Sequence, residues 1–162
     1  MSVWSGNVAS RLLAGGVLLA CCASLPAAAQ TITAANPAGI ADALQELGYR
    51  AQIETDDRGD PKVSSTMEGV NYEIHFYGCT EAMNCKYLNF SAGFNMANGL
   101  PMASVNEWNR GKLVGKVYVD DENDPYLQYF VTTDGGLSRQ NFADVVDWWR
   151  VALEQFTDHI GW

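Results

Sequence analysis

The sequence has few of the residues that catalytic and metal sites need. Its two histidines, His75 and His159, lie on a predicted strand and at the end of the last predicted helix, and nothing brings them together. No Gly-x-Ser-x-Gly motif precedes a helix, and no glycine-rich phosphate-binding loop is present. The sequence therefore predicts a protein that is not an enzyme and holds no cofactor. A hydrolase with an unrecognised site is the last of three functional alternatives.

Basic residues are also scarce. The chain has 10 Lys and Arg against 19 Asp and Glu, which gives a net charge of −9. Proteins that bind nucleic acids use clusters of basic side chains to displace counterions from phosphates, and no such cluster occurs here. We therefore expect that the protein does not bind nucleic acid.

The chain lacks an apolar run long enough to span a membrane, which takes about 20 residues. The run from Leu12 to Leu25 follows a single charge, Arg11, and precedes the small residues 27–29. This pattern predicts a cleaved signal peptide at 1–29 and a mature domain at 30–162 with 9 basic and 19 acidic residues, in the periplasm or secreted. A lipoprotein processed at Cys21 stays open as the alternative.

Of the four cysteines, only Cys79 and Cys85 lie beyond the predicted signal peptide. Their Cys-x5-Cys spacing is wider than the Cys-x-x-Cys of thiol-disulfide catalysts, and a zinc site would need a second pair. An even number of cysteines outside the cytoplasm favours a structural disulfide, here across a hairpin loop.

Hydrophobic periodicity and turn residues predict nine elements in the order α-β-β-β-β-α-β-β-α. Helices are expected from Asn36 to Gly48, up to Gly111 and after Ser138, with either Pro101 or Ser104 starting the second. Strands are expected at 49–55, with Ile53 on a buried face, and at 62–67, 70–77, 86–94, 112–119 and 125–132. This order predicts a single α+β domain with a largely antiparallel sheet.

The segment Val105–Arg110, the hairpin with Lys116–Asp120, the Gly135-Gly136 turn and the final helix resemble the YbjN-domain family. Members of that family are often labelled bacterial sensory-transduction regulators. The resemblance implies a fold similar to type III secretion chaperones, with a twisted antiparallel sheet packed by helices. The signal peptide and the cysteines would make this chain a secreted member.

Asn106 and Asn109 lie three residues apart in the short helix. Their amides could tie this helix to the backbone of the following hairpin, or they could contact a ligand. Together with Gly135 and Gly136 they form the structural motif that the resemblance highlights.

Three exposed side chains are expected to form an interaction surface: Trp108, Trp148 and Arg110. The favoured function is thus an extracytoplasmic protein-interaction or regulatory module whose partner is another protein, with a homodimer left open. The alternative is a small-molecule or calcium-binding protein. Asp120, Asp121 and Asp124, in an acidic turn, are weak candidates for metal ligands.

Overall fold

The computed structural model describes residues 1–2 and 31–162, so nearly all of the predicted signal peptide lies outside the described residues. Within them, three helices and six strands follow in the predicted order. They are α1 (Pro37–Glu46), β1 (Gln52–Thr55), β2 (Pro61–Met67), β3 (Val70–Tyr77), β4 (Tyr87–Gly93), α2 (Met102–Gly111), β5 (Lys116–Val119), β6 (Pro125–Thr132) and α3 (Arg139–Ile160). The α+β class is therefore confirmed.

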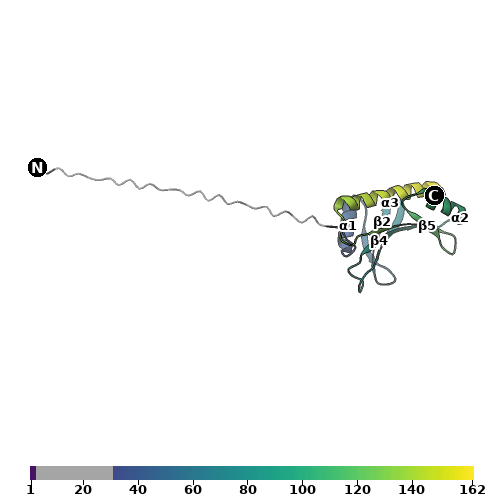
Figure 1. The fold of residues 1–162 in the computed structure, drawn as a ribbon, viewed down its shortest axis with the longest axis horizontal. Helices are drawn as coiled ribbons and strands as arrows, with labels where there is room; N and C mark the ends of the chain where they lie inside the picture. The colour runs from purple at the N-terminus through teal and green to yellow at the C-terminus, as the bar shows by residue number, and fades with distance from the viewer. Residues whose placement is uncertain (3–30) are drawn as a thin grey trace.

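The six strands form one antiparallel sheet in the order β1-β2-β3-β4-β6-β5. Figure 1 shows α3 running along the sheet, with α1 toward one end of it and α2 toward the other, while hairpin loops project on the opposite side. In the part of the chain that is described, no helix has the length and hydrophobicity needed to cross a membrane.

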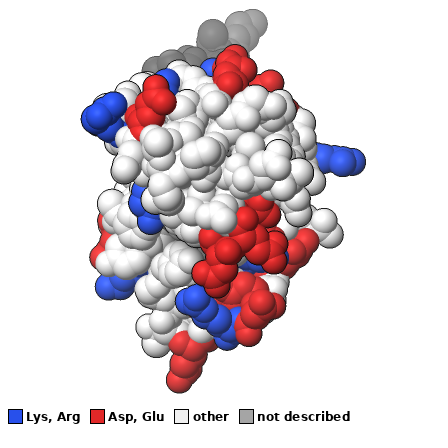
Figure 2. Space-filling model, turned by 90° about the vertical axis from the view of Figure 1, so that its right-hand side faces the viewer, with Lys and Arg blue, Asp and Glu red and all other residues white. Residues whose placement is uncertain are grey.

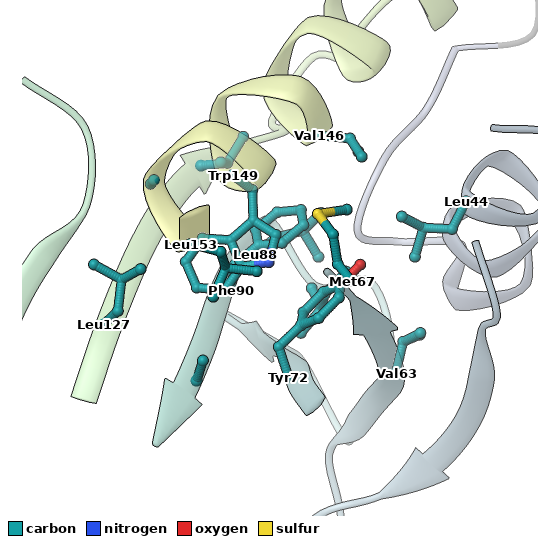
Figure 3. Close-up of a cluster of buried hydrophobic side chains, with 14 of the residues drawn as sticks. Leu44, Val63, Met67, Tyr72, Leu88, Phe90, Leu127, Val146, Trp149 and Leu153 are labelled. Carbon is teal, nitrogen blue, oxygen red and sulfur yellow. The ribbon is translucent and has the colours of Figure 1, made fainter. Parts of the chain in front are cut away.

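The core lies between α3 and the central strands. Trp149 has no exposed surface, and its ring centroid lies 5.6 Å from that of Tyr72 on β3 and 5.7 Å from that of Phe90 on β4. Figure 3 shows Val146 and Leu153 on the same helix, above the strands. The predicted alternation of β3 is confirmed, because every second side chain from Val70 to Phe76 is buried. One face of the sheet is thus covered by helices, and the other carries the remaining side chains.

Local signals act as predicted at several boundaries. Asn36 caps α1 by accepting a hydrogen bond from Gly39 N (3.1 Å), and Ser138 caps α3 by accepting one from Asn141 N (3.0 Å). Glu68 and Gly69 both have positive φ, 50° and 79°, as the two central residues of a tight β-hairpin require.

The structure corrects three details. The fifth strand begins at Lys116 and not at Lys112, because Lys112 ends α2 and Gly115 has a positive φ of 86°. Helix α2 begins after Pro101, so Ser104 lies inside the helix instead of capping it. The first strand begins at Gln52 and not at Tyr49, and all four of its side chains are exposed. Ile53, expected on a buried face, is 48% exposed because β1 lies at the edge of the sheet with a neighbouring strand on one side only.

Candidate functional site

The predicted interaction surface is wrong for Trp108, which is 1% exposed. Its indole nitrogen donates to Gly115 O (2.7 Å) and its ring centroid lies 5.0 Å from that of Phe156. The Val105–Trp108 spacing of three residues puts both side chains on the face of α2 that packs inward. Trp148 is 44% exposed and Arg110 is exposed as well, so these two residues stay predictions.

The structural role proposed for the two asparagines holds for Asn109 only. Its Nδ2 donates to Val117 O and its Oδ1 accepts from Val117 N, both at 2.9 Å. The side-chain amide therefore bonds the outer edge of β5 as a neighbouring strand would. Asn106 is exposed, and its side chain forms no hydrogen bond within residues 31–162.

The Gly135-Gly136 turn lies where the first described residues meet the end of β6. Both glycines have positive φ, 86° and 85°, and a Cβ on Gly136 would lie 2.8 Å from Cβ of Thr31. The turn precedes Leu137, which exchanges backbone hydrogen bonds of 2.8 Å with Ile32. Both glycines are thus required by backbone geometry and close packing.

A buried threonine supports this region and was not singled out from the sequence. Thr133 is 1% exposed. Its Oγ1 accepts from Ala34 N (2.8 Å) and donates to Lys86 O (2.9 Å), which joins three distant segments. No local sequence signal could identify it, since both partners come from other parts of the fold.

Cys79 and Cys85 lie close together in the β3–β4 loop, where a disulfide can join them. Cys85 is buried and Cys79 is partly buried against the core. The geometry agrees with the predicted bridge, whose oxidation state stays a prediction. The loop leads directly from Tyr77 into Tyr87, so it borders one end of the sheet.

Ser104 and His159 form the one serine–histidine contact among the described residues. His159 Nε2 lies 2.9 Å from Ser104 Oγ and 3.2 Å from Ser104 O. Both contacts join the imidazole of α3 to the same residue of α2. The pair joins α2 to α3, and neither residue lines the groove described below.

The acidic turn, residues 120–124, does not gather its carboxylates around one point. Asp120 Oδ1 accepts from Glu122 N (3.0 Å) and Asp124 N (2.9 Å), and Asp124 Oδ1 accepts from Met96 N (2.8 Å). In the described part of the chain, no three His, Cys, Asp or Glu side chains converge as metal ligands. The carboxylates of Asp120 and Asp124 thus fix the turn by accepting backbone hydrogen bonds.

The face of the sheet turned away from the helices, here called the uncovered face, is an ordered array. Strand register places its side chains in rows across the strands. One row consists of Glu54, Lys62, His75, Asn89 and Phe130, and the next consists of Gln52, Ser64, Glu73, Ser91, Gln128 and Lys116. In these rows β4 and β6 contribute the neutral polar side chains Asn89, Ser91 and Gln128 and the aromatic Phe130.

Ion pairs organise the β1–β3 side of the uncovered face. Lys62 Nζ lies 2.5 Å from Glu73 Oε1 and 3.5 Å from Glu54 Oε2, and His75 Nε2 lies 3.1 Å from Glu73 Oε2. The hydrogen bond to Glu73 raises the pKa of Lys62 above its ordinary value. Lys62 therefore forms ion pairs with both Glu54 and Glu73.

Aromatic side chains occupy both ends of the uncovered face. Tyr118 and Tyr126, next to the acidic turn, stack with ring centroids 5.2 Å apart and planes at 13°. Tyr87 and Phe130 lie 5.4 Å apart near the cysteine loop, beside Tyr77. Phe130 is 59% exposed. The signal for this array was present in the sequence, since these residues take the outward positions of the predicted strands.

A groove of about 1110 Å³ crosses the uncovered face, and a hollow of about 410 Å³ adjoins it through their shared residues Tyr77 and Gln128. Gly93 makes room for one wall, because a Cβ there would lie 2.6 Å from Cε1 of Tyr126. Concave surfaces with aromatic walls and a few placed polar groups are typical of binding sites.

Comparison with known proteins gives a family and a similarity to solved structures. Residues 36–162 match the model of the YbjN family, which is described as "Putative bacterial sensory transduction regulator". The sequence matches no curated protein. Among solved structures, the chain is similar to the Yersinia pestis type III secretion chaperone SycH, determined in complex with a stable fragment of YscM2. Identity is 16%, 76% of this chain and 95% of that chain are covered, and the TM-score is 0.45.

The family match covers α1 to α3 and includes every strand. It also includes Asn109 and the Gly135-Gly136 turn, two of the features on which the sequence resemblance depended. Because the match at residues 36–162 extends over more than half of the chain, the protein belongs to the YbjN family.

Proposed function

We propose that the protein is a non-enzymatic binding module that acts outside the cytoplasm and docks another protein on its uncovered face. The observation that carries the proposal is the groove of about 1110 Å³, bordered by exposed aromatic side chains. Aromatic residues are enriched where proteins bind proteins, because they bury a large area with few rotatable bonds. The name of the family, a regulator of sensory transduction, is compatible with a module that acts by binding.

Two further observations support a role without catalysis. The Ser104–His159 contact holds two helices together, with its ring nitrogen 3.2 Å from a backbone carbonyl oxygen. Glu73, which lines the groove, pairs with Lys62 and contacts His75, so it is not an isolated acid or base. A binding role needs neither a nucleophile nor a free general base.

The location rests on the sequence. The pattern of residues 1–29 is that of a secretory signal, and the paired cysteines suit an oxidising compartment. We expect the mature protein in the periplasmic or secreted fraction, with Gln30 as its first residue by N-terminal sequencing. An acylated Cys21 at the N-terminus would contradict this expectation.

Site-specific photo-crosslinking in cells that express the full chain tests the docking face. Gln128 lies in the middle of the uncovered face, and Glu154 lies exposed on α3 on the other side of the molecule. We expect p-benzoylphenylalanine at position 128 to give a discrete protein adduct, and the same probe at 154 to give none. Adducts at 154 alone would place the partner on the helices and refute the proposal.

A further inference from the structure

The uncovered face carries an uneven charge that indicates the chemistry of its partner. Charged side chains around the groove are Glu73, Asp120, Glu122 and Asp124 on the acidic side and Arg50 on the basic side, with His75 in addition. Glu73 is neutralised by Lys62. No ion pair of the described residues involves the acidic turn. The uncompensated negative charge is therefore concentrated at one end of the groove.

This charge lies next to the stacked tyrosines. Tyr118 on β5 and Tyr126 on β6 lie two residues from the ends of the acidic turn, and both line the groove together with three of its carboxylates. Lys116 Nζ lies 5.6 Å from the ring centroid of Tyr118, so a cation already rests against this pair. A tyrosine face beside carboxylates attracts a guanidinium or ammonium group through two additive electrostatic effects.

Figure 2 shows the end of the molecule that carries α2 and the C-terminus. Acidic side chains gather in one area of this end, below a broad surface without charged side chains. The whole chain has a net charge of −9, so its long-range field also attracts basic partners and repels acidic ones.

We propose that the segment docked in the groove is a basic stretch of polypeptide. Its Arg or Lys side chains would lie against Tyr118 and Tyr126 and pair with Asp120, Glu122 and Asp124. This inference rests on the proposed function and adds the chemistry of the partner. A second copy of the chain carries the same net negative charge, so it suits the groove less well than a basic segment does. The negative charge of the groove, and not its apolar area, is therefore the reason to expect a basic segment there.

The test is fluorescence anisotropy of labelled twelve-residue peptides titrated with the mature protein. Three peptides share a Gly-Ser backbone and carry four Arg, four Gln or four Glu residues. We expect the Arg peptide to bind at least ~10-fold more tightly than the Gln peptide, with affinity falling as salt rises, and the Glu peptide not to bind.

Matched variants locate the binding. Glu122 lines the groove, whereas Asp121, its neighbour in the same turn, does not. We expect Glu122→Gln to weaken binding of the Arg peptide about three-fold and Asp121→Asn to leave it nearly unchanged. Tyr118→Ala is expected to weaken it about five-fold, because the cation–π contact and the stacking are lost.

Each other outcome overturns the inference in a specific way. Equal effects of Glu122→Gln and Asp121→Asn would show diffuse attraction to an acidic surface instead of a site. Equal binding of the Arg and Gln peptides, both weakened by Tyr118→Ala, would refute a basic partner while leaving docking on the uncovered face intact. Failure of crosslinking at position 128 would refute the docking face itself, so the two failures are distinguishable.

Discussion

Replacing Asn109 tests how the edge of the sheet is held. In Asn109→Ala the two 2.9 Å hydrogen bonds to Val117 N and Val117 O are lost together. Asn106→Ala is the matched control, because it changes the same residue type in the same helix at a side chain without a hydrogen bond to residues 31–162. Both variants gain the higher helix propensity of alanine, so their difference isolates the two bonds.

The magnitude follows from these contacts. A protein hydrogen bond contributes about 0.5–1.5 kcal/mol net, so two bonds give about 1–3 kcal/mol. Asn109 is exposed, and water can reach part of the broken pair. We therefore expect Asn109→Ala to be less stable than Asn106→Ala by about 1–2 kcal/mol, or by about 4–8 °C in Tm.

Urea denaturation followed by circular dichroism, with thermal melts in parallel, measures this difference. The two variants should keep similar m-values, because neither changes the area buried on folding. If the two variants unfold at the same urea concentration, the amide of Asn109 contributes nothing to the sheet, and the interpretation of the Asn-x-x-Asn pattern as a structural joint is wrong.

Three further predictions concern the core and the cysteine loop. Trp149→Ala is expected to lower the free energy of unfolding by about 3–5 kcal/mol. Trp148→Ala should lower it by less than about 1 kcal/mol, because only Trp149 is fully buried. Equal losses of the two variants in urea denaturation would contradict this prediction. Burial raises the pKa of Tyr72 to about 12, above its unfolded value near 10, so stability is full below pH 10 and falls between pH 10 and 12. Tyr72→Phe should flatten this alkaline decline in pH-dependent melts. The mature protein should show no free thiol on alkylation under denaturing conditions, and reduction of the Cys79–Cys85 bridge should lower stability by about 2–3 kcal/mol; one labelled cysteine per chain would rule the bridge out.

The order of elements could be predicted because the signals for it are local. Asn36, Ser138 and the Glu68-Gly69 turn act through neighbours within a few residues. The alternation of β3 follows from the period of a strand and holds in the structure. Burial depends on which other elements cover a residue, and a local pattern does not encode this. Ile53 on the edge strand was expected on a buried face, but its side chain is largely exposed.

The candidate site was less accessible to sequence reasoning. Trp108 was assigned to a surface although its spacing from Val105 already pointed inward. The Ser104–His159 contact joins residues 55 apart and depends on how two helices pack, which no local pattern encodes. The groove likewise arises from the pairing of β4 with β6, which are separated in sequence by α2 and β5.

The bond between Asn109 and β5 also limits how copies of the chain could polymerise. A fibre that grows by strand addition needs two unpaired sheet edges on every molecule, so that each molecule can pair with one neighbour at either edge. In this sheet the β5 edge is occupied at Val117 by a side chain of the same chain, which leaves β1 as the receptive edge. A strand from a second molecule could pair with β5 at Val117 only by displacing the Asn109 amide. This amide thus protects one edge of the sheet against strand addition.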